Sequence, residues 1–446
     1  MPSLPSTQHP EMTDLFVNPY AGYSYAYPHK LAYRDFALPV PLNDLWAEES
    51  KTNLFLYLHI PFCHYRCGFC NLFTAAQPQE TMVEHYLDAC QRQFQVVQRE
   101  IQPESISQFA VGGGTPSILS NAQLRDCMHA IQEVFRFSIP QIAASIEVSP
   151  DTIDRDKCLL IKELGFSRVS IGVQSFDPTD ASACGRPQNQ KQVLDSLSIL
   201  ASTGFPTFNI DLIYGMNSQT EASWLASLNQ ALEYSPNELF LYPLYVRELT
   251  GLGKTGKHAS DTRLRLYEMG RDFLLEQGFT QQSMRQFVKK YNTQTNDRSY
   301  CCQVDGMIGL GCGARSYTTK MHYSHDFAVS QGKTKEIIRQ FVLSADSDFA
   351  QVGHGFRLNA DEQHRRYVIQ SILNTTGLDV TAYQRRFSSD CCDDLPELFP
   401  LLRAGYLEYH QNVIKPTARG LQWSDAIGPS LYSPSVQRLM EESTIQ

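Results

Sequence analysis

The sequence contains no apolar run near the roughly 18 residues that a membrane-spanning helix needs. Its first residues, Met1 to Ser6, lack the basic and apolar segments of a secretion signal. Positive charge is also scarce, with 38 Lys and Arg against 47 Asp and Glu and a net charge of -9. Because nucleic-acid binding needs a basic surface, this balance argues against a general nucleic-acid binder. We expect a cytoplasmic protein without stable membrane insertion, whose partners are small molecules or proteins.

The twelve cysteines show no framework spacing outside one triplet. Small secreted proteins pair cysteines at regular spacings, so the scattered ones predict reduced thiols in the cytoplasm. The triplet is Cys63, Cys67 and Cys70, in a loop that follows a short apolar strand beginning near Leu54. The spacing is therefore C-x3-C-x2-C.

Thiolates separated by two or three residues can point inward together on soft iron. Three thiolates leave a four-iron cluster one ligand short, so one iron is free to bind another molecule. The alternatives are a zinc site and three buried free thiols. Zinc usually takes four ligands and paired C-x2-C units. His64 or His59 offers a fourth ligand, but no second cysteine pair stands nearby, and we favour the iron–sulfur interpretation.

From residue 54 to about 290, short apolar runs alternate with amphipathic stretches of helical length. The pattern predicts strands at Leu54–His59, Phe109–Val111, Ser145–Val148, Arg168–Val173, Thr207–Ile213 and Leu239–Tyr242. It predicts helices near 80–100, 120–135, 152–164, 188–202, 219–233 and 261–276. Six such units imply a parallel sheet that binds ligands at the carboxyl ends of its strands. The cysteine loop follows the first strand, at that end.

Further motifs follow the later strands. Gly112, Gly113 and Gly114 follow the second strand, where glycines serve either as turn residues or to bring backbone N–H groups close to a ligand. Glu147 ends the third strand, and Gln174 follows the fourth.

Asp211 lies within the fifth strand. A carboxylate inside an apolar strand is costly unless it is paired. Either Arg186 or Arg168 pairs with Asp211 and Glu147, or a ligand does.

The stretch from Tyr57 to Gly215 resembles the oxygen-independent coproporphyrinogen III oxidase branch of the radical S-adenosylmethionine (SAM) superfamily, which includes a haem-chaperone relative. The resemblance implies an α/β fold with a partial (β/α)6 TIM-type barrel. It implies a 4Fe-4S cluster on Cys63, Cys67 and Cys70 that cleaves SAM reductively to a 5′-deoxyadenosyl radical. The positions that match SAM contacts are Tyr57, Phe69, Gly113, Gly114, Thr115, Glu147, Gln174, Arg186 and Asp211.

The resemblance further implies a flavodoxin-type electron donor and a porphyrin(ogen) or related tetrapyrrole as the carboxylated substrate. Oxidases of this branch carry another cysteine where this chain has Leu72, which puts oxidase activity itself in question. A haem chaperone, an enzyme that alters haem, and a regulatory winged-helix protein are the alternatives. The last is disfavoured because the C-terminal segment is acidic.

The expected organisation has five parts. These are a disordered tail at 1–15, an aromatic arm at 16–50, the barrel at 51–290, a barrel-completing and connecting segment at 291–360, and a winged-helix-like α+β domain at 361–446. The arm, with its tyrosines between Tyr20 and Tyr33, resembles the N-terminal segment of the oxidases. It forms either an edge strand against a core or a pocket wall for a flat, acidic molecule.

Overall fold

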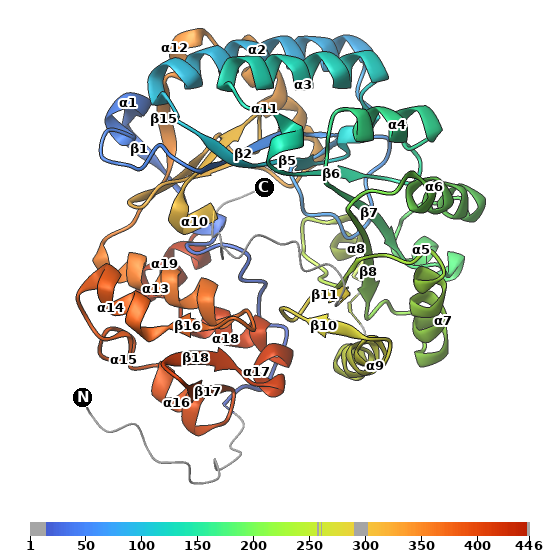
Figure 1. Ribbon diagram of the computed structural model, residues 1–446, viewed down its shortest axis with the longest axis vertical. Coiled ribbons are helices and arrows are strands. Elements are labelled where there is room, and N and C mark those ends of the chain that lie inside the picture. The colour runs from blue at the N-terminus through green and yellow to red at the C-terminus, as the bar shows by residue number, and fades with distance from the viewer. Residues whose placement is uncertain (1–14, 257, 260, 290–301, 444–446) are drawn as a thin grey trace. The chain divides into compact units, whose positions relative to one another are not determined.

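The computed structural model describes residues 15–256, 258–259, 261–289 and 302–443 (Figure 1). It contains two compact units. Unit 1 comprises Met1–Ala32, Thr280–Phe287 and Leu358–Ser443, and unit 2 comprises Tyr33–Phe279, Val288–Arg357 and Thr444–Gln446. The tail expected at 1–15 lies outside the described residues except for Leu15, as does the start of the segment expected at 291–360. The arm expected at 16–50 is divided between the units at Tyr33.

Unit 2 is built on one long sheet in the order β1-β15-β14-β13-β12-β2-β5-β6-β7-β8-β9. Neighbouring strands from β12 to β9 pair in parallel, and those from β1 to β12 pair antiparallel. The strands are β1 (Arg34–Pro41), β2 (Leu54–Ile60), β5 (Ile106–Gly113), β6 (Ala143–Val148), β7 (Arg168–Gln174), β8 (Thr207–Tyr214), β9 (Glu238–Pro243), β12 (Met307–Leu310), β13 (Arg315–Tyr317), β14 (Met321–Ser324) and β15 (Gln351–Arg357). Among the described strands the sheet stays open, which confirms the predicted α/β partial barrel.

Unit 2 contains both long and short helices, and the long ones cover the outside of the curved sheet (Figure 1). They are α1 (Leu42–Leu45), α2 (Glu80–Ile101), α3 (Asn121–Phe135), α4 (Arg155–Glu163), α5 (Pro178–Ala183), α6 (Gln190–Thr203), α7 (Glu221–Leu232), α8 (Gly251–Lys254), α9 (Arg263–Glu276), α10 (Cys302–Asp305), α11 (Gln331–Leu343) and α12 (Asp346–Phe349). A small parallel pair, β3 (Phe62–Cys63) and β4 (Ala75–Ala76), brackets the cysteine loop. No described helix is long and apolar enough to cross a membrane.

The two faces of the parallel strands differ in polarity. Along β8, Ile210 and Leu212 are fully buried, whereas Asn209 and Asp211 point to the opposite face. Burying an aliphatic side chain of this size stabilises the fold by roughly 1.5–3 kcal/mol. Burial of the apolar face against the helices therefore contributes most of the stability of the sheet. The register places Ser170 of β7 beside both Glu147 of β6 and Asn209. The polar side chains therefore gather on the inner face of the sheet.

The predicted strands and helices of the barrel are present, with ends shifted by a few residues. The helix expected from 152 begins at Arg155, because Asp154 caps it by accepting a hydrogen bond from the Lys157 N–H at 2.8 Å. The antiparallel strands β13, β14, β15 and β1 were not predicted. They extend the sheet beyond β12, the strand that pairs with β2, and do not continue the alternation of parallel strands and helices.

Unit 1 combines helices with a small antiparallel sheet in the order β16-β18-β17. Its winged-helix-like character stays a prediction. Its elements are α13 (Ala360–Ile372), β16 (Leu378–Asp379), α14 (Val380–Phe387), α15 (Cys391–Asp394), α16 (Leu398–Arg403), β17 (Leu407–His410), β18 (Val413–Pro416), α17 (Ala418–Gln422), α18 (Ser424–Ser430) and α19 (Pro434–Glu441). The boundary between the units falls within the short strands β10 (Phe279–Gln281) and β11 (Gln286–Lys289).

The tyrosines of the arm pack within unit 1. The Tyr27 hydroxyl is fully buried and donates a hydrogen bond to Glu362, and Ser24 lies 2.8 Å from the Tyr432 hydroxyl. The guanidinium of Arg285 lies 3.7 Å from the ring centroid of Tyr23. The described residues before Tyr33 form no strand, so the edge-strand interpretation of the tyrosine segment is wrong. The pocket interpretation stays a prediction.

Candidate active site

The three cysteines lie in the loop between β2 and α2, at the carboxyl end of the first parallel strand. Each is partly buried and carries a free thiol. The loop is closed by β3 and β4, in which Cys63 pairs with Ala76. The predicted position of the triplet, at the edge of the sheet where βα-loops converge, is therefore observed.

Gly68 fixes the centre of this loop through its backbone. Its N–H donates to the Cys184 carbonyl at 3.0 Å, and its carbonyl accepts from the Leu252 N–H at 2.8 Å. A Cβ on Gly68 would lie 2.7 Å from the Cys184 carbonyl oxygen, which is closer than van der Waals contact allows. A Cβ on Gly185 or on Gly251 would lie 3.2 Å from the Gly68 Cα. Three glycines, distant in sequence, thus allow the cysteine loop to be clamped from two sides.

Neither histidine of the loop is poised as a fourth ligand. The ring nitrogens of His59 lie 3.2 Å from the Tyr57 hydroxyl and 3.0 Å from the Phe73 carbonyl. His64 Nδ1 lies 2.9 Å from the Asp151 carboxylate, and its ring is half exposed. These contacts weaken the zinc interpretation, and the donor set fits an iron–sulfur cluster with three protein ligands.

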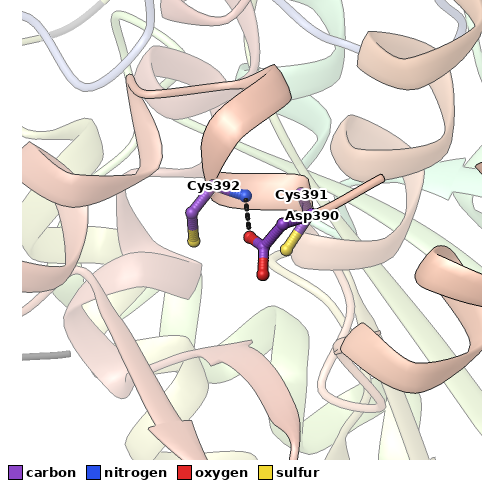
Figure 2. A group of neighbouring side chains, drawn as sticks. All are labelled: Asp390, Cys391 and Cys392. Carbon is purple, nitrogen blue, oxygen red and sulfur yellow. Dashed lines mark hydrogen bonds between the residues drawn. The ribbon is translucent and has the colours of Figure 1, made fainter. Parts of the chain in front are cut away.

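A second set of possible ligands lies in unit 1. Figure 2 shows Asp390, Cys391 and Cys392, whose ligand atoms lie within 4.8 Å of one another. Asp390 caps α15 by accepting a hydrogen bond from the Cys392 N–H at 2.8 Å, and both thiols are buried. A cap and two buried thiols account for this group structurally.

Each loop sulfur has a different polar neighbour. The Thr115 hydroxyl donates to Cys63 Sγ at 3.5 Å, the Thr74 hydroxyl lies 3.8 Å from Cys70 Sγ, and an Arg186 N–H donates to Cys67 Sγ at 3.1 Å. Burial raises the pKa of Cys63 to about 12. Burial also raises the pKa of Cys67, against the opposing effect of Arg186. The thiols must therefore release protons when they bind metal.

The glycine segment after β5 serves close packing and does not offer free N–H groups. The N–H of Gly113 donates to Glu147 at 3.2 Å, that of Gly114 to Ile60 at 2.8 Å, and that of Thr115 to Phe62 at 2.8 Å. The interpretation that these amides are presented to a ligand is wrong. A Cβ on Gly113, which has φ +113°, would lie 2.6 Å from the His59 ring. The glycines instead bring the end of β5 against the cysteine loop.

Glu147 and Asp211 lie on the inner face of the sheet without an ion-pair partner among the described residues. Arg168 pairs with Glu238 at 2.8 Å, and Arg186 donates to Cys67 and to a carbonyl. Neither arginine considered from the sequence forms an ion pair with these carboxyls, although the charge of Arg168 lowers the pKa of both. The possibility that a ligand does so remains.

The electrostatic consequence is a pair of raised pKa values. Burial, with the charge of Asp211, raises the pKa of Glu147 to about 7. Burial raises the pKa of Asp211 to about 6, although Asn209 donates to it at 2.7 Å. Protein surrounds both carboxyls, yet Glu147 remains exposed and Asp211 partly so. Both side chains are therefore accessible to solvent and to a ligand, and a cationic ligand there would favour their ionised forms.

The remaining predicted site residues come from the same edge. The Tyr57 side chain lies on β2, and burial raises the pKa of its hydroxyl. Phe69 packs against an apolar cluster that includes Ile213 and Leu244. Gln174 ends β7 in a left-handed conformation, with φ 72°. The structure thus brings the predicted residues to the carboxyl edge of one sheet, while their contacts with SAM stay predictions.

Sequence reasoning missed Gln188, Ser170 and Asn209, which hold Arg186 and Asp211 in place. Their signal was weak because single polar residues on a strand or before a helix carry no motif. It also missed Gly185 and Gly251, since glycines near helix ends are ordinary caps and turns.

We expect Gly68→Ala to leave the fold intact and to impair iron binding. The new methyl group cannot fit beside the Cys184 carbonyl, so the cysteine loop must shift. Circular dichroism and iron content after anaerobic reconstitution test this. Gly332→Ala on α11, where a Cβ meets nothing within 4 Å, is the matched control. Iron content equal to that of the wild type would contradict the proposed clamp.

The raised pKa of Glu147 predicts a pH-dependent stability. Because the folded protein binds this proton more tightly than the unfolded chain, the free energy of unfolding falls as pH rises from the ordinary value of 4.5 through about 7. Glu147→Gln removes this loss, so the metal-free variant gains stability relative to wild type at pH 8. Urea unfolding at pH 5 and pH 8 measures the difference. Exposed Glu133→Gln serves as the control, and identical pH dependence of wild type and Glu147→Gln would refute the assignment.

Comparison with known proteins identifies the superfamily. Residues 57–231 match the model of the radical SAM superfamily. The chain is 27% identical over 423 residues to oxygen-independent coproporphyrinogen III oxidase of Escherichia coli, covering 90% of each protein. It is 26% identical over 379 residues to the heme chaperone HemW of Bacillus subtilis, covering 82% of this chain and 95% of that protein.

A solved structure agrees. The structure of coproporphyrinogen III oxidase (HemN) from Escherichia coli, a radical SAM enzyme, matches with a TM-score of 0.78 and 25% identity, covering 92% of this chain and 97% of that one. The cofactors of the superfamily are a 4Fe-4S cluster and SAM, which suit the three-thiol loop described above. Residues 57–231 therefore form a radical SAM domain, and most of the chain is similar to oxygen-independent coproporphyrinogen III oxidase and to the heme chaperone HemW.

Proposed function

We propose that this enzyme uses the cluster held by Cys63, Cys67 and Cys70 to cleave SAM and acts with the resulting radical on a porphyrinogen or related tetrapyrrole. The proposal rests on one observation, that two groups of side chains lie at the same edge of the sheet. Three free thiols stand on a clamped loop, and two carboxyls without ion-pair partners share that edge. Together they offer iron ligands and counter-charges for a cationic cofactor.

Different residues of the chain would bind different groups of SAM, according to the charge and polarity of each group. Glu147 and Asp211 are acceptors for ammonium and hydroxyl groups, because they are surrounded by protein and lack an arginine or lysine partner. The two Arg186 donors that make no hydrogen bond within the protein suit a carboxylate. Tyr57 and Phe69 offer aromatic surfaces against which an apolar or aromatic part of SAM can pack.

When bound and reduced, the cluster supplies one electron that cleaves SAM to a 5′-deoxyadenosyl radical. The protein must then place the substrate and exclude water and oxygen. Relatives named coproporphyrinogen III oxidase point to a tetrapyrrole as the substrate. We further propose a flavodoxin-type electron donor and a cytoplasmic location, where reduced thiols are maintained.

A haem chaperone is the second candidate, and the residue at position 72 favours it. Leu72 replaces the cysteine that the resemblance assigns to oxidases, and its side chain is 52% exposed beside Cys70. A thiol at this place is absent, whereas the three cluster cysteines remain. The similarity to the heme chaperone HemW extends over most of the chain.

One experiment separates the two candidates. The anaerobically reconstituted protein receives dithionite and SAM, with coproporphyrinogen III, with haem, or without either. The enzymatic proposal expects 5′-deoxyadenosine to form in step with a changed tetrapyrrole. Stoichiometric haem binding without 5′-deoxyadenosine formation would instead support the chaperone. No 5′-deoxyadenosine under any condition, from protein with a complete cluster, would contradict the proposed enzyme.

Replacing Cys67 with Ala should abolish iron–sulfur absorbance near 400 nm and SAM cleavage together. Two thiolates cannot retain the cluster that three hold. Cys158→Ala on α4 is the control, because this buried thiol lies outside the loop and contacts Thr203. Absorption spectra and 5′-deoxyadenosine yield measure both effects. A Cys67→Ala protein with full absorbance would show that the loop does not hold the cluster.

Asp211→Asn should keep the cluster and weaken SAM binding by about tenfold or more, the equivalent of about 1.4 kcal/mol. The substitution removes a negative charge that would face the cationic cofactor. Equilibrium binding of SAM to the reconstituted protein measures the change, and iron analysis verifies loading. Unchanged affinity at equal iron content would exclude Asp211 from the SAM pocket.

A further inference from the structure

Arg186 lies against the middle cysteine of the loop. Its Nη1 donates a hydrogen bond to Cys67 Sγ at 3.1 Å, and the residue is 6% exposed. Charge-assisted hydrogen bonds are about twice as strong as neutral ones, and water screens this buried bond poorly.

The guanidinium is held in this position by the protein itself. Its Nη2 donates to the Gly172 carbonyl at 2.6 Å, and its Nε donates to Gln188 Oε1 at 2.9 Å. Gln188 is itself fixed, because its Nε2 donates to the Ser175 carbonyl at 2.7 Å. The Tyr65 ring lies 5.8 Å from the guanidinium carbon. Three of the five N–H donors are thus used within the protein, and the contact with Cys67 needs no bound ligand to support it.

The three sulfurs are therefore unequal. Cys63 and Cys70 have only threonine hydroxyls nearby, at 3.5 and 3.8 Å. The neighbouring Arg66, which lies within the loop, donates to the Cys70 carbonyl at 3.1 Å and not to a sulfur. Among the described residues of the loop and its neighbours, Arg186 is the charged residue that donates a hydrogen bond to a loop sulfur, that of Cys67.

We propose that Arg186, acting through Cys67, raises the reduction potential of the cluster. A reduced cluster carries one more negative charge than an oxidised one, and a cationic N–H donor at a ligand sulfur stabilises the more negative state. Arg186 is therefore a positioning residue, because its fixed charge acts on the cluster through Cys67. The role is separate from the SAM contact that the resemblance implies. The inference rests on the proposed cluster on Cys63, Cys67 and Cys70.

The test compares the wild type with Arg186→Gln, Arg186→Lys and Arg66→Gln, all reconstituted anaerobically and assayed without SAM. Iron and sulfide analysis establishes loading, and redox titration followed by electron paramagnetic resonance gives the midpoint potential. For Arg186→Gln we expect the ratio of reduced to oxidised cluster at a fixed potential to fall at least tenfold, a shift of about 59 mV. Arg186→Lys keeps the charge but loses the fork geometry, so its potential should lie between the two.

Arg66→Gln is the matched control because it removes one positive charge from the same loop without removing a bond to sulfur. Its potential should change less than half as much as that of Arg186→Gln. Equal shifts in the two variants would mean that net charge, and not the hydrogen bond, sets the potential. An unchanged potential in Arg186→Gln at full loading would overturn the inference.

A second measurement uses only the wild-type protein, so it does not depend on whether a variant can bind the cluster. In wild-type protein labelled with ¹⁵N-arginine, electron–nuclear double resonance of the reduced cluster should detect a ¹⁵N coupling without SAM. Its absence in a fully loaded sample would also overturn the inference. Failure of the wild type to bind a 4Fe-4S cluster would instead refute the proposed function, so the two failures are distinguishable.

Discussion

The backbone of Gly68 is held between the Cys184 carbonyl and the Leu252 N–H, and the geometry of the cysteine loop depends on this clamp. A loop that buries the thiols of Cys63 and Cys67, whose pKa values burial raises, gains little from burying them until a metal binds. The positions of the sulfurs must therefore come from the protein. Backbone bonds supply this order because they do not depend on side-chain rotamers. Glycine is required where three segments of backbone meet.

The inner face of the sheet shows the complementary constraint. Glu147 and Asp211 have raised pKa values because the fold surrounds them without an ion-pair partner. Such a site lowers the free energy of unfolding of the ligand-free protein at neutral pH. Binding of a cationic ligand raises this free energy again. The nearby arginines take other partners, Arg168 on Glu238 and Arg186 on Cys67. The carboxyls of Glu147 and Asp211 therefore remain available to a ligand. The positive charge of Arg186 is directed toward Cys67 of the cysteine loop.

The sequence predicted six of the parallel strands because these segments are apolar, and it predicted the helices between them because these are amphipathic. It also predicted the cysteine triplet and the polar residues at the strand ends, since both follow local patterns. The extension through β13, β14, β15 and β1 was not predicted, because its pairing joins segments as distant as Arg34 and Gly355. The edge-strand interpretation of the tyrosine segment before Tyr33 failed because tyrosines serve packing as readily as strands, as the buried Tyr27 shows.

The chemistry within the site was harder to predict. The amides of Gly113 and Gly114 have partners within the protein, which a glycine motif cannot reveal. The contact between Arg186 and Cys67 joins residues 119 positions apart, and no spacing rule announces it. Local patterns thus located the site, whereas the partners of its charges required the structure.

The central claim is an iron–sulfur cluster with one iron that no cysteine of this chain holds. Mössbauer spectroscopy of the ⁵⁷Fe-reconstituted protein, recorded with and without SAM, tests it most directly. The account predicts a cuboidal four-iron cluster in which one iron changes its isomer shift when SAM is added. Zinc as the bound metal, or four irons that all remain unaffected by SAM, would contradict it.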